Sequence, residues 1–421
     1  MERLPGFRDF YPEPVPDREA WSAQARQYVF EHWRSTARRY GFVEYDGPPL
    51  EPLELFTLKS GDEIVKQLFD FVDKGGRAVA LRPEMTPTLA RMVAAHQRNY
   101  KKPLKWYSIP QLFRYEKQQR GRLREHFQFN ADIIGESDSA ADAELIALLI
   151  DILRGFGLTE QDFIVRLSSR RVWEEFLATK KSKINIRPDQ ADTFYQVIDK
   201  LGRDSTAESQ SKLAAIGLSL AEVHEFIHAA QPTTELQTIL DNLAARGLAR
   251  YVQIDYRIVR GLAYYTGPVY EAFDRKGEFR AIAGGGRYDN LIKLISGGRV
   301  DLPALGFGMG DVVLIELLKA RGLLPRFDSA LDAFCIVEDE TLRSESLKLV
   351  QRLRDAGLAV DYALGRGKPD KQFKRASELG AKCTVKLERS TNGLIVRVRN
   401  LASRTEKAGP IEQVETLVKT L

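Results

Sequence analysis

The chain has 421 residues, of which 43% are hydrophobic and 29% are charged. This length predicts two to four domains, and this composition excludes a disordered or fibrous chain. The 63 Lys and Arg residues exceed the 58 Asp and Glu residues by five, so a contact with nucleic acid is expected to be local rather than spread over one basic surface.

The first part of the chain has the pattern of an α+β domain. Apolar residues at steps of three and four predict a helix over 17–40, and Gly41 is its expected end. Short β-rich runs follow, separated by loops rather than by regular crossover helices, which favours an antiparallel sheet. These runs are 42–45, 67–72, 78–81, 106–113 and 127–134.

The middle of the chain changes character. A helix is predicted over 140–156 and a strand over 163–167, placed to rejoin the first sheet. Residues 170–249 are charged and helix-rich, which predicts a helical insertion. Its expected helices are 171–183, 188–201, 220–230 and 234–246, and strand patterns return at 251–255 and 269–273.

The last part of the chain predicts a separate module. Residues 322–329 have the composition of a linker, and an alternating β-α-β-α pattern begins at 333. Such alternation predicts a small α/β domain with a partly parallel sheet. The predicted domains are therefore 1–169 with 250–325, 170–249, and 330–421.

Cysteine usage and hydropathy bound the cellular setting. Cys335 and Cys383 are the two cysteines, too few for a disulfide framework or a thiolate zinc site, so we expect a reducing compartment. No stretch approaches the ~20 apolar residues that cross a bilayer. The sequence predicts a cytoplasmic protein without a membrane partner.

One strand-loop-strand pattern, over 113–132, carries a polar face. Side chains at period two in such a hairpin point to one side of the sheet. Guanidinium groups match phosphate oxygens bidentately, so this face suits a nucleotide, while a solvated face of weak salt bridges is the alternative. Its residues are Arg114, Glu116, Gln128, Asn130 and Asp132.

A second group of candidate residues lies at 257–267 and 284–289. Three consecutive glycines, 284–286, are expensive in chain entropy, which indicates close approach of a ligand to the backbone, with a glycine bulge as the alternative. Tyr264 and Tyr265 offer a ring wall and a hydroxyl, although adjacent tyrosines are as often packing residues.

Two motif matches carry little weight. Residues 224–228 fit the H-E-x-x-H pattern of zinc peptidases, but a catalytic zinc needs a third protein ligand that the sequence does not offer, so we interpret the match as a helix-surface coincidence. The glycine run at 306–310 lacks the spacing of a dinucleotide fingerprint. No metal site built from protein side chains is predicted.

Taken together, four segments resemble the histidyl-tRNA synthetases, a branch of the class II aminoacyl-tRNA synthetases. The pairing of Arg-Gly-Leu-x-Tyr-Tyr with Gly-Gly-Arg-Tyr-Asp is highly specific to this family. The similarity covers nearly the whole chain, including the insertion and the C-terminal domain that reads the anticodon in the family. The matching segments, in family order, are 81–86, 113–135, 259–265 and 284–289.

The resemblance implies a histidine-tRNA ligase with a class II antiparallel-sheet catalytic domain, a helical insertion and a C-terminal α/β anticodon-binding domain. In this reaction L-histidine and ATP, with Mg²⁺, give histidyl-adenylate and pyrophosphate, and the histidyl group then passes to tRNA(His). It also implies a homodimer formed through residues 41–53.

The resemblance assigns the ATP contacts. Arg114 and Arg260 would act as the catalytic cations on opposite sides of the α-phosphate, stabilising charge that develops during in-line attack. Glu116 would face the adenine, and Arg122 would meet the γ-phosphate.

It also assigns the amino-acid contacts. Acidic, hydroxyl and amide groups would grip the α-ammonium and carboxylate, while Asp132 and Tyr264 or Tyr265 would read the imidazole, which presents one donor and one acceptor when neutral. The full implied set is Glu84, Thr86, Arg114, Gln128, Asp132, Arg260, Tyr264 and Tyr265.

The tRNA contacts implied by the resemblance lie in two places. Gln119 and Arg120, in the loop after the first polar strand, would meet the acceptor end. A basic helix of the last domain would meet the anticodon, because cations positioned along one element track a phosphate backbone. Its candidates are Lys371, Gln372, Lys374 and Arg375.

Three departures from the family pattern stand out. Ala263 replaces an aspartate of the histidine pocket, and His126 and Phe127 reverse the usual order. Val313 stands where the family has its third-motif ATP-binding arginine. The combination resembles a subgroup found in plant organelles and some bacteria, so we expect coordinated variation rather than decay.

The alternative from another functional class is a non-catalytic paralogue, such as the regulatory subunit of the ATP phosphoribosyltransferase of histidine biosynthesis. Such paralogues generally lack the anticodon domain and lose tRNA-facing residues. The chain keeps its last ~90 residues and both Arg114 and Arg260, which favours the ligase.

Overall fold

The computed structural model describes residues 2–13, 15, 20–58, 65–116, 123–181, 188–201, 204–229, 231–259, 264–327, 331–391 and 393–420. The chain divides into two compact units. Unit 1 comprises Met1–Tyr11 and Asp17–Pro325, and unit 2 comprises Pro12–Pro16 and Arg326–Leu421.

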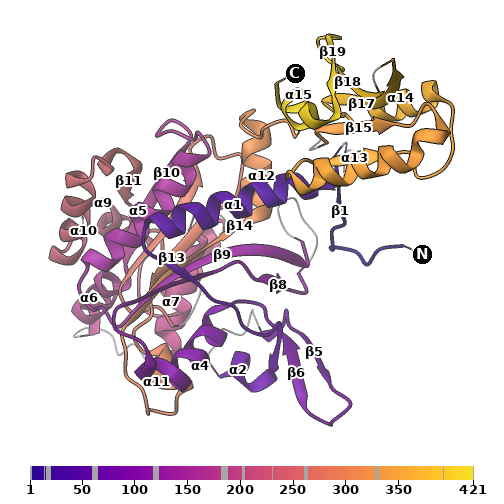
Figure 1. The fold of residues 1–421 in the computed structure, drawn as a ribbon. Helices are drawn as coiled ribbons and strands as arrows, with labels where there is room; N and C mark the ends of the chain where they lie inside the picture. The colour runs from indigo at the N-terminus through magenta and orange to yellow at the C-terminus, as the bar shows by residue number, and fades with distance from the viewer. Residues whose placement is uncertain are drawn as a thin grey trace. The chain divides into compact units, whose positions relative to one another are not determined.

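Unit 1 is built on one large sheet, shown in Figure 1. Its strands pair antiparallel except at the two edges, where β3 runs parallel to β7 and β11 runs parallel to β10. The predicted antiparallel sheet is therefore confirmed, and β10 rejoins it as expected. In spatial order the strands are β11 (Val252–Ile254), β10 (Phe163–Ser169), β12 (Pro268–Asp274), β13 (Ala283–Arg287), β14 (Ala304–Gly310), β9 (Glu125–Ile134), β7 (Leu104–Ser108) and β3 (Val43–Glu44), with β8 (Gln111–Phe113) beside β9.

Three long helices cover one face of this sheet. They are α1 (Ala23–Arg39), α5 (Ala140–Gly155) and α12 (Asp311–Ala320), and α5 is almost wholly apolar. Their side chains share one core with Phe129, Ala131 and Ile133 of β9. This layer supports the strands from behind.

Helix α1 begins later than its sequence pattern predicts. The Ser22 side chain accepts a hydrogen bond from Ala25 N at 3.0 Å and caps the helix. Residues 20–22 are therefore not helical, and Trp21–Ser22 forms β2, which pairs with Phe10–Tyr11 as β1. Residues 17–19 lie outside the described part of the chain.

The opposite face of the sheet carries smaller elements. A second core joins Ile134 and Ala304 of the sheet to Leu89, Val93 and nearby side chains. The elements on this side are β4 (Leu50–Pro52), α2 (Leu53–Thr57), β5 (Phe69–Val72), β6 (Ala78–Leu81), α4 (Thr86–His96), the 3₁₀ turn η1 (Gln97–Asn99) and α11 (Leu291–Ile295).

The segment between β10 and β11 is helical, and its buried side chains, Trp173 among them, belong to the same core as the sheet. Thr206–Ala214 adds a helix, α8, that the sequence patterns did not predict. The other helices are α6 (Arg170–Lys181), α7 (Pro188–Lys200), α9 (Leu220–Ala229), α10 (Thr234–Ala245) and the 3₁₀ turn η2 (Ala249–Tyr251). His224 and His228 are exposed on α9, and the described residues hold no group of three metal-ligating side chains.

Unit 2 has a mixed sheet, as its alternating pattern predicts. β15 (Ala333–Ile336) lies parallel to β16 (Val360–Tyr362) and to β17 (Cys383–Ser390), and β18 (Gly393–Asn400) and β19 (Glu406–Pro410) continue antiparallel. The remaining elements are η3 (Glu340–Leu342), α13 (Arg343–Asp355), α14 (Pro369–Glu378), η4 (Ile411–Gln413) and α15 (Val414–Thr420). Among the described residues, no helix combines the length and the apolar character that a membrane span requires.

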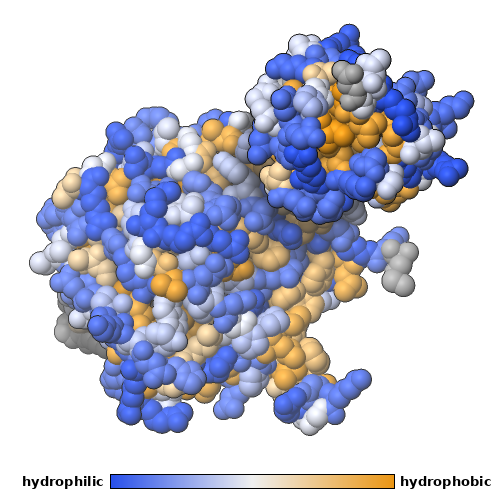
Figure 2. All heavy atoms as spheres, viewed as in Figure 1, coloured by the Kyte–Doolittle hydropathy of each residue, from blue (hydrophilic) through white to orange (hydrophobic). Residues whose placement is uncertain are grey.

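Hydrophilic residues cover most of the visible face of unit 1, and apolar residues gather near the β5–β6 hairpin (Figure 2). Phe71 and Val72 of β5 are 50% and 68% exposed, and Val43 of β3 is 63% exposed. Apolar side chains that remain this exposed in a folded chain are candidates for contact with another protein surface.

Candidate active site

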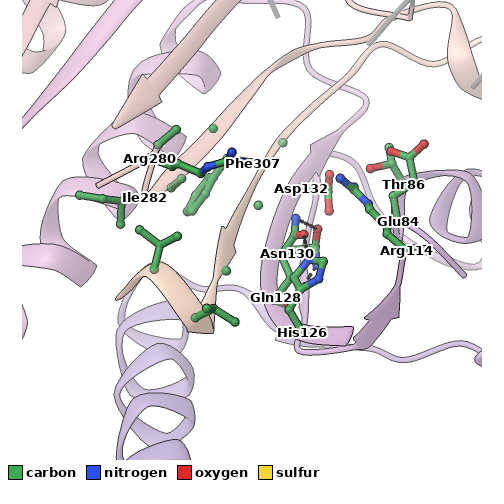
Figure 3. Close-up of a pocket in the computed structure, with 18 of the residues that line it drawn as sticks. Glu84, Thr86, Arg114, His126, Gln128, Asn130, Asp132, Arg280, Ile282 and Phe307 are labelled. Atoms are coloured by element: carbon green, nitrogen blue, oxygen red, sulfur yellow. Dashed lines mark hydrogen bonds between the residues drawn. The ribbon is translucent and has the colours of Figure 1, made fainter. Parts of the chain in front are cut away.

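A polar pocket of about 290 Å³ opens over the middle strands of unit 1, as Figure 3 shows. Its walls come from β9, β13 and β14, from the loop before α4 and from the residues around Tyr264. Among its lining residues are Glu84, Thr86, Arg114, Glu116, His126, Gln128, Asn130, Asp132, Tyr264, Tyr265, Arg280, Ile282, Gly284, Tyr288, Phe307, Val312 and Val313.

Strand β9 sorts its side chains by period two. Gln128, Asn130 and Asp132 line the pocket, whereas the residues between them are buried in the core against the long helices. Arg114 and Glu116 line the same pocket. The polar face predicted from the sequence therefore exists, and all five of its residues come together.

Strand β14 leaves room for these side chains because its pocket-facing positions are glycines. Gly306 lies opposite Asp132 in the antiparallel register. A Cβ at Gly306 would overlap the Asp132 carboxylate, and a Cβ at Gly308 would overlap the amide of Gln128. The polar side chains of β9 can thus lie flat across the neighbouring strand.

The glycine run in β13 has a different role from the one expected. Gly284 lines the pocket. A Cβ at Gly285 would overlap the carbonyl of Gly306, however, and a Cβ at Gly286 would crowd the carbonyl of Pro268. Two of the three glycines therefore serve the close approach of neighbouring strands, and one borders the space for a ligand.

Two carboxylates at one end of the pocket are each held by a tyrosine. The Tyr264 hydroxyl donates to Glu84 Oε2 at 2.8 Å, and the Tyr288 hydroxyl donates to Asp132 Oδ1 at 2.5 Å. Burial raises the pKa of Asp132 to about 7, although the Tyr288 hydrogen bond opposes this shift. Asp132 can therefore change its charge near neutral pH.

The middle of the pocket is a chain of side-chain hydrogen bonds. His126 Nε2 lies 3.2 Å from Gln128 Oε1, and Gln128 Nε2 donates to Asn130 Oδ1 at 3.1 Å. Desolvation, helped by the positive charge of Arg114, lowers the pKa of His126 to about 3, so its ring is neutral. Arg114 Nε donates to the carbonyl of Pro83 at 2.9 Å, which fixes the direction of its guanidinium.

A buried ion cluster supports the pocket from below. Arg8 contacts Glu125 at 2.6 Å and Asp311 at 2.8 Å, and all three side chains are at most 1% exposed. Asp311 also accepts from the backbone N–H of Phe127 at 3.1 Å. The cluster ties the N-terminal segment to the start of β9 and to the start of α12, next to the pocket residue Val312.

Several residues expected at the site cannot be placed. Arg260, together with Gln119, Arg120 and Arg122, lies outside the described residues, as does Ala263. Val313 is placed, and it lines the pocket as a half-buried residue of α12.

The candidates for anticodon contact lie on α14 of unit 2. Lys371, Lys374 and Arg375 are exposed. Gln372 is only 2% exposed, and its amide bonds to Val337 N, Val337 O and Gly367 O at 2.8–2.9 Å. Gln372 therefore anchors its helix, and the three cations form its solvent-facing side.

Sequence reasoning missed two residues of the amino-acid end. Tyr288 belongs to the Gly-Gly-Arg-Tyr-Asp motif, which was the available signal, but its partner Asp132 is 156 residues away in the chain. Asn130 was placed on the polar face without a task, and the structure shows it bonded to Gln128.

Comparisons with known proteins agree with these motifs. A family model described as "Histidyl-tRNA synthetase" matches residues 14–310, and one described as "Anticodon binding domain" matches residues 332–421. A histidine–tRNA ligase of Opitutus terrae is 45% identical over 100% of this chain and 98% of its own length. A chloroplastic/mitochondrial histidine–tRNA ligase of Arabidopsis thaliana is 38% identical over 90% of this chain and 78% of its own length.

Solved structures show the same fold. The histidyl-tRNA synthetase from Nostoc sp. PCC 7120 superimposes with a TM-score of 0.75 at 22% identity, covering 97% of both chains. A Bacillus halodurans structure titled as an ATP phosphoribosyltransferase regulatory subunit/histidyl-tRNA synthetase superimposes with a TM-score of 0.70 over 90% of this chain and 96% of its own. Fold alone does not separate ligase from paralogue, but the full-length sequence matches do, and the chain belongs to the histidyl-tRNA synthetase family.

Proposed function

We propose that this chain is a histidine-tRNA ligase, which activates L-histidine with ATP and transfers the histidyl group to tRNA(His). The observation that carries the proposal is the single pocket that joins Arg114 to the polar side chains of β9 and to the tyrosine-held carboxylates. A cation for a phosphate and a matched set of donors and acceptors for an amino acid thus share one space.

The amino acid would occupy the end of the pocket near Asp132. Glu84 and Thr86 are suited to the α-ammonium, and Gln128 is suited to the carboxylate. The imidazole would lie between Asp132 and Tyr264 or Tyr265, where a carboxylate and a hydroxyl match its donor and its acceptor. Analogues that lack these groups would leave buried polar atoms unpaired, which gives selectivity.

ATP would occupy the side of the pocket near His126. Attack of a histidine carboxylate oxygen on the α-phosphorus forms the mixed anhydride and releases pyrophosphate. Arg114 would stabilise the charge on the α-phosphate oxygens, with Arg260 on the opposite side and Arg122 at the γ-phosphate. Glu116 would receive the adenine amino group.

Mg²⁺ would accompany the nucleotide rather than occupy a protein cage. The part of the chain that the structure describes holds no cluster of three metal-ligating side chains. Mg²⁺ keeps several waters and is commonly bound through substrate phosphates with one or two carboxylates, an arrangement this pocket permits.

The second substrate would contact both units. Gln119 and Arg120 are proposed for the acceptor end, and the exposed Lys371, Lys374 and Arg375 of α14 for the anticodon, with Gln372 positioning that helix. The match of residues 332–421 to an anticodon-binding model supports this assignment.

We further propose three modules and a homodimer. Residues 1–169 with 250–325 would form the catalytic domain, 170–249 the insertion, and 330–421 the anticodon-binding domain. Residues 41–53 would meet the second copy, and Val43 and Leu50 are 63% and 38% exposed there. Burial raises the pKa of Cys335 and Cys383 to about 12, so both are unreactive thiols of the kind expected in the cytoplasm.

The direct test is histidine-dependent exchange of pyrophosphate into ATP by the purified chain, followed by charging of tRNA(His). We expect both, and we expect Arg114→Gln to lower the exchange rate by at least 100-fold. A folded protein that binds histidine yet supports neither reaction would point to the regulatory paralogue instead.

A further inference from the structure

One wall of the pocket carries residues that the proposed reaction leaves without a task. Figure 3 shows Arg280, Ile282 and Phe307 on one side and Glu84, Thr86 and Arg114 on the other, with the polar residues of β9 between them. Val312 and Val313 also line the pocket. This wall is apolar except for the guanidinium of Arg280.

The backbone around Arg280 is held at several points. Ile282 N donates to the carbonyl of Ala272 at 2.8 Å, and Glu278 N donates to the Asp274 carboxylate at 2.9 Å. Arg321, directly after α12, binds both Asp274 and Glu278 at 2.5 and 2.9 Å. The β12–β13 connection is thus fastened on both sides of Arg280, which places the side chain reproducibly at the pocket.

The helix end on this wall cannot serve an anionic ligand in its place. The first turn of α12 begins with Asp311, whose carboxylate is fully buried and paired with Arg8. Its negative charge already occupies the positive end of the helix dipole. A phosphate near Val312 and Val313 therefore needs a separate cation.

Among the described residues, the pocket lining holds two arginines, Arg114 and Arg280, on different walls. Two guanidinium groups that face one space from different sides suit an extended polyanion such as a triphosphate. The apolar side chains of Ile282, Phe307 and Val313 suit the flat face of a base beside it. In the resemblance described above, the cation at this wall comes from position 313, where this chain has valine.

We propose that Arg280 is a nucleotide-binding residue that contacts the terminal phosphates of ATP and takes the place of the arginine missing at position 313. The inference rests on the proposed function, since ATP must be the ligand of the pocket. It explains how a chain with Val313 retains a cation on that wall.

The test compares binding of ATP and of AMP to Arg280→Ala by equilibrium dialysis without histidine, together with exchange kinetics. A lost charge-assisted contact weakens binding by roughly 10- to 100-fold. We expect this loss for ATP in both the dissociation constant and KM, while AMP affinity and KM for histidine stay within about twofold. Arg280→Lys should lose less, because it keeps the charge without the bidentate fork.

Two further variants make the result specific. Arg275→Ala removes an exposed arginine from the same connection, outside the pocket lining, and should change neither nucleotide. Val313→Arg in the Arg280→Ala background should recover a large part of the ATP affinity. Unfolding midpoints equal to wild type would show that the variants fold.

Each other outcome has a distinct meaning. Unchanged ATP affinity in Arg280→Ala, with active wild type, overturns the inference and leaves the proposed function standing. Equal weakening of ATP and AMP overturns the assignment to the terminal phosphates. An inactive wild type that binds no ATP overturns the proposed function itself.

Discussion

At the scale of single residues, the pocket is governed by two buried pairs of a carboxyl group and a tyrosine. Tyr264 donates to Glu84, and Tyr288 donates to Asp132. Burial raises the pKa of both tyrosines well above 10, so they remain donors at any physiological pH. Each carboxyl group is thereby oriented, and its remaining lone pairs are directed to the ligand space.

The raised pKa of Asp132 predicts a pH-dependent stability. Because burial raises this pKa from 3.8 to about 7, the unfolded chain releases the proton first, and stability falls as pH rises between these values. Asp132→Asn removes the effect. Between pH 5 and 8 the wild type should lose up to about 3 kcal/mol relative to the variant, measured as the difference in urea unfolding free energy.

The companion variant Tyr288→Phe separates the causes of this shift. It removes the hydrogen bond that lowers the Asp132 pKa, so the pH range of the loss should extend upward. Parallel stability curves for wild type and Asp132→Asn would contradict the assignment of the raised pKa.

Residue-level prediction from sequence works where chain periodicity decides and stops where folding decides. The alternation of β9 was sufficient to group Gln128, Asn130 and Asp132. The Tyr288 partner of Asp132 and the position of Arg280 opposite Arg114 depend on the order of strands β13, β14 and β9, which no local pattern encodes.

At the scale of elements, the pocket exists because β14 carries glycines where β9 carries long polar side chains. Gly308→Ala adds a Cβ that overlaps the Gln128 amide, the mobile end of a flexible side chain. The fold should therefore survive while Gln128 rotates away. We expect KM for histidine to rise by roughly 10-fold, as when one buried hydrogen bond is lost.

The control lies two residues further along the same strand. A Cβ at Gly310 would meet nothing nearer than His126 Cδ2 at 3.9 Å. Gly310→Ala should keep the wild-type KM for histidine, measured by pyrophosphate exchange. Equal effects of the two substitutions would show that strand geometry, not the position of Gln128, is responsible.

The Arg8 cluster joins three elements and predicts a large loss of stability. Arg8→Met leaves the Glu125 and Asp311 carboxylates buried without their cation, which should destabilise the protein by about 3–5 kcal/mol. The matched control is Arg3→Met, because Arg3 pairs with Asp9 at 45% and 52% exposure and should contribute at most about 1 kcal/mol. Urea unfolding of both variants decides, and similar losses would rule out a structural role for the cluster.

Element boundaries depend on caps and tertiary contacts more than on periodicity. The apolar spacing over 17–40 predicts a helix, but Ser22 and the β1–β2 pair begin it at Ala23. Helix α4 begins with Thr86 and Pro87 inside a segment noted only for its motif residues, so its helical character was missed.

At the scale of the whole molecule, the net charge of +5 is an average over surfaces with different tasks. The pocket of unit 1 concentrates carboxylates and arginines, whereas α14 of unit 2 presents Lys371, Lys374 and Arg375 to solvent. The two-unit division predicts that amino-acid activation and tRNA recognition respond to separate sets of substitutions.

Substitutions on α14 test this separation. Alanine at Lys371, Lys374 or Arg375 should raise KM for tRNA(His) and lower the salt dependence of tRNA binding by about 0.7–0.9 per phosphate contact, while pyrophosphate exchange stays unchanged. Lys348→Ala, an exposed lysine of α13, is the control.

Gln372→Ala should behave differently from its neighbours on α14. It releases Val337 and Gly367 and should lower the unfolding temperature of unit 2 as well as tRNA affinity. A triple variant of the three cations that charges tRNA normally would place anticodon recognition on another face of unit 2. A triple variant that loses pyrophosphate exchange would show instead that the two units are coupled during activation.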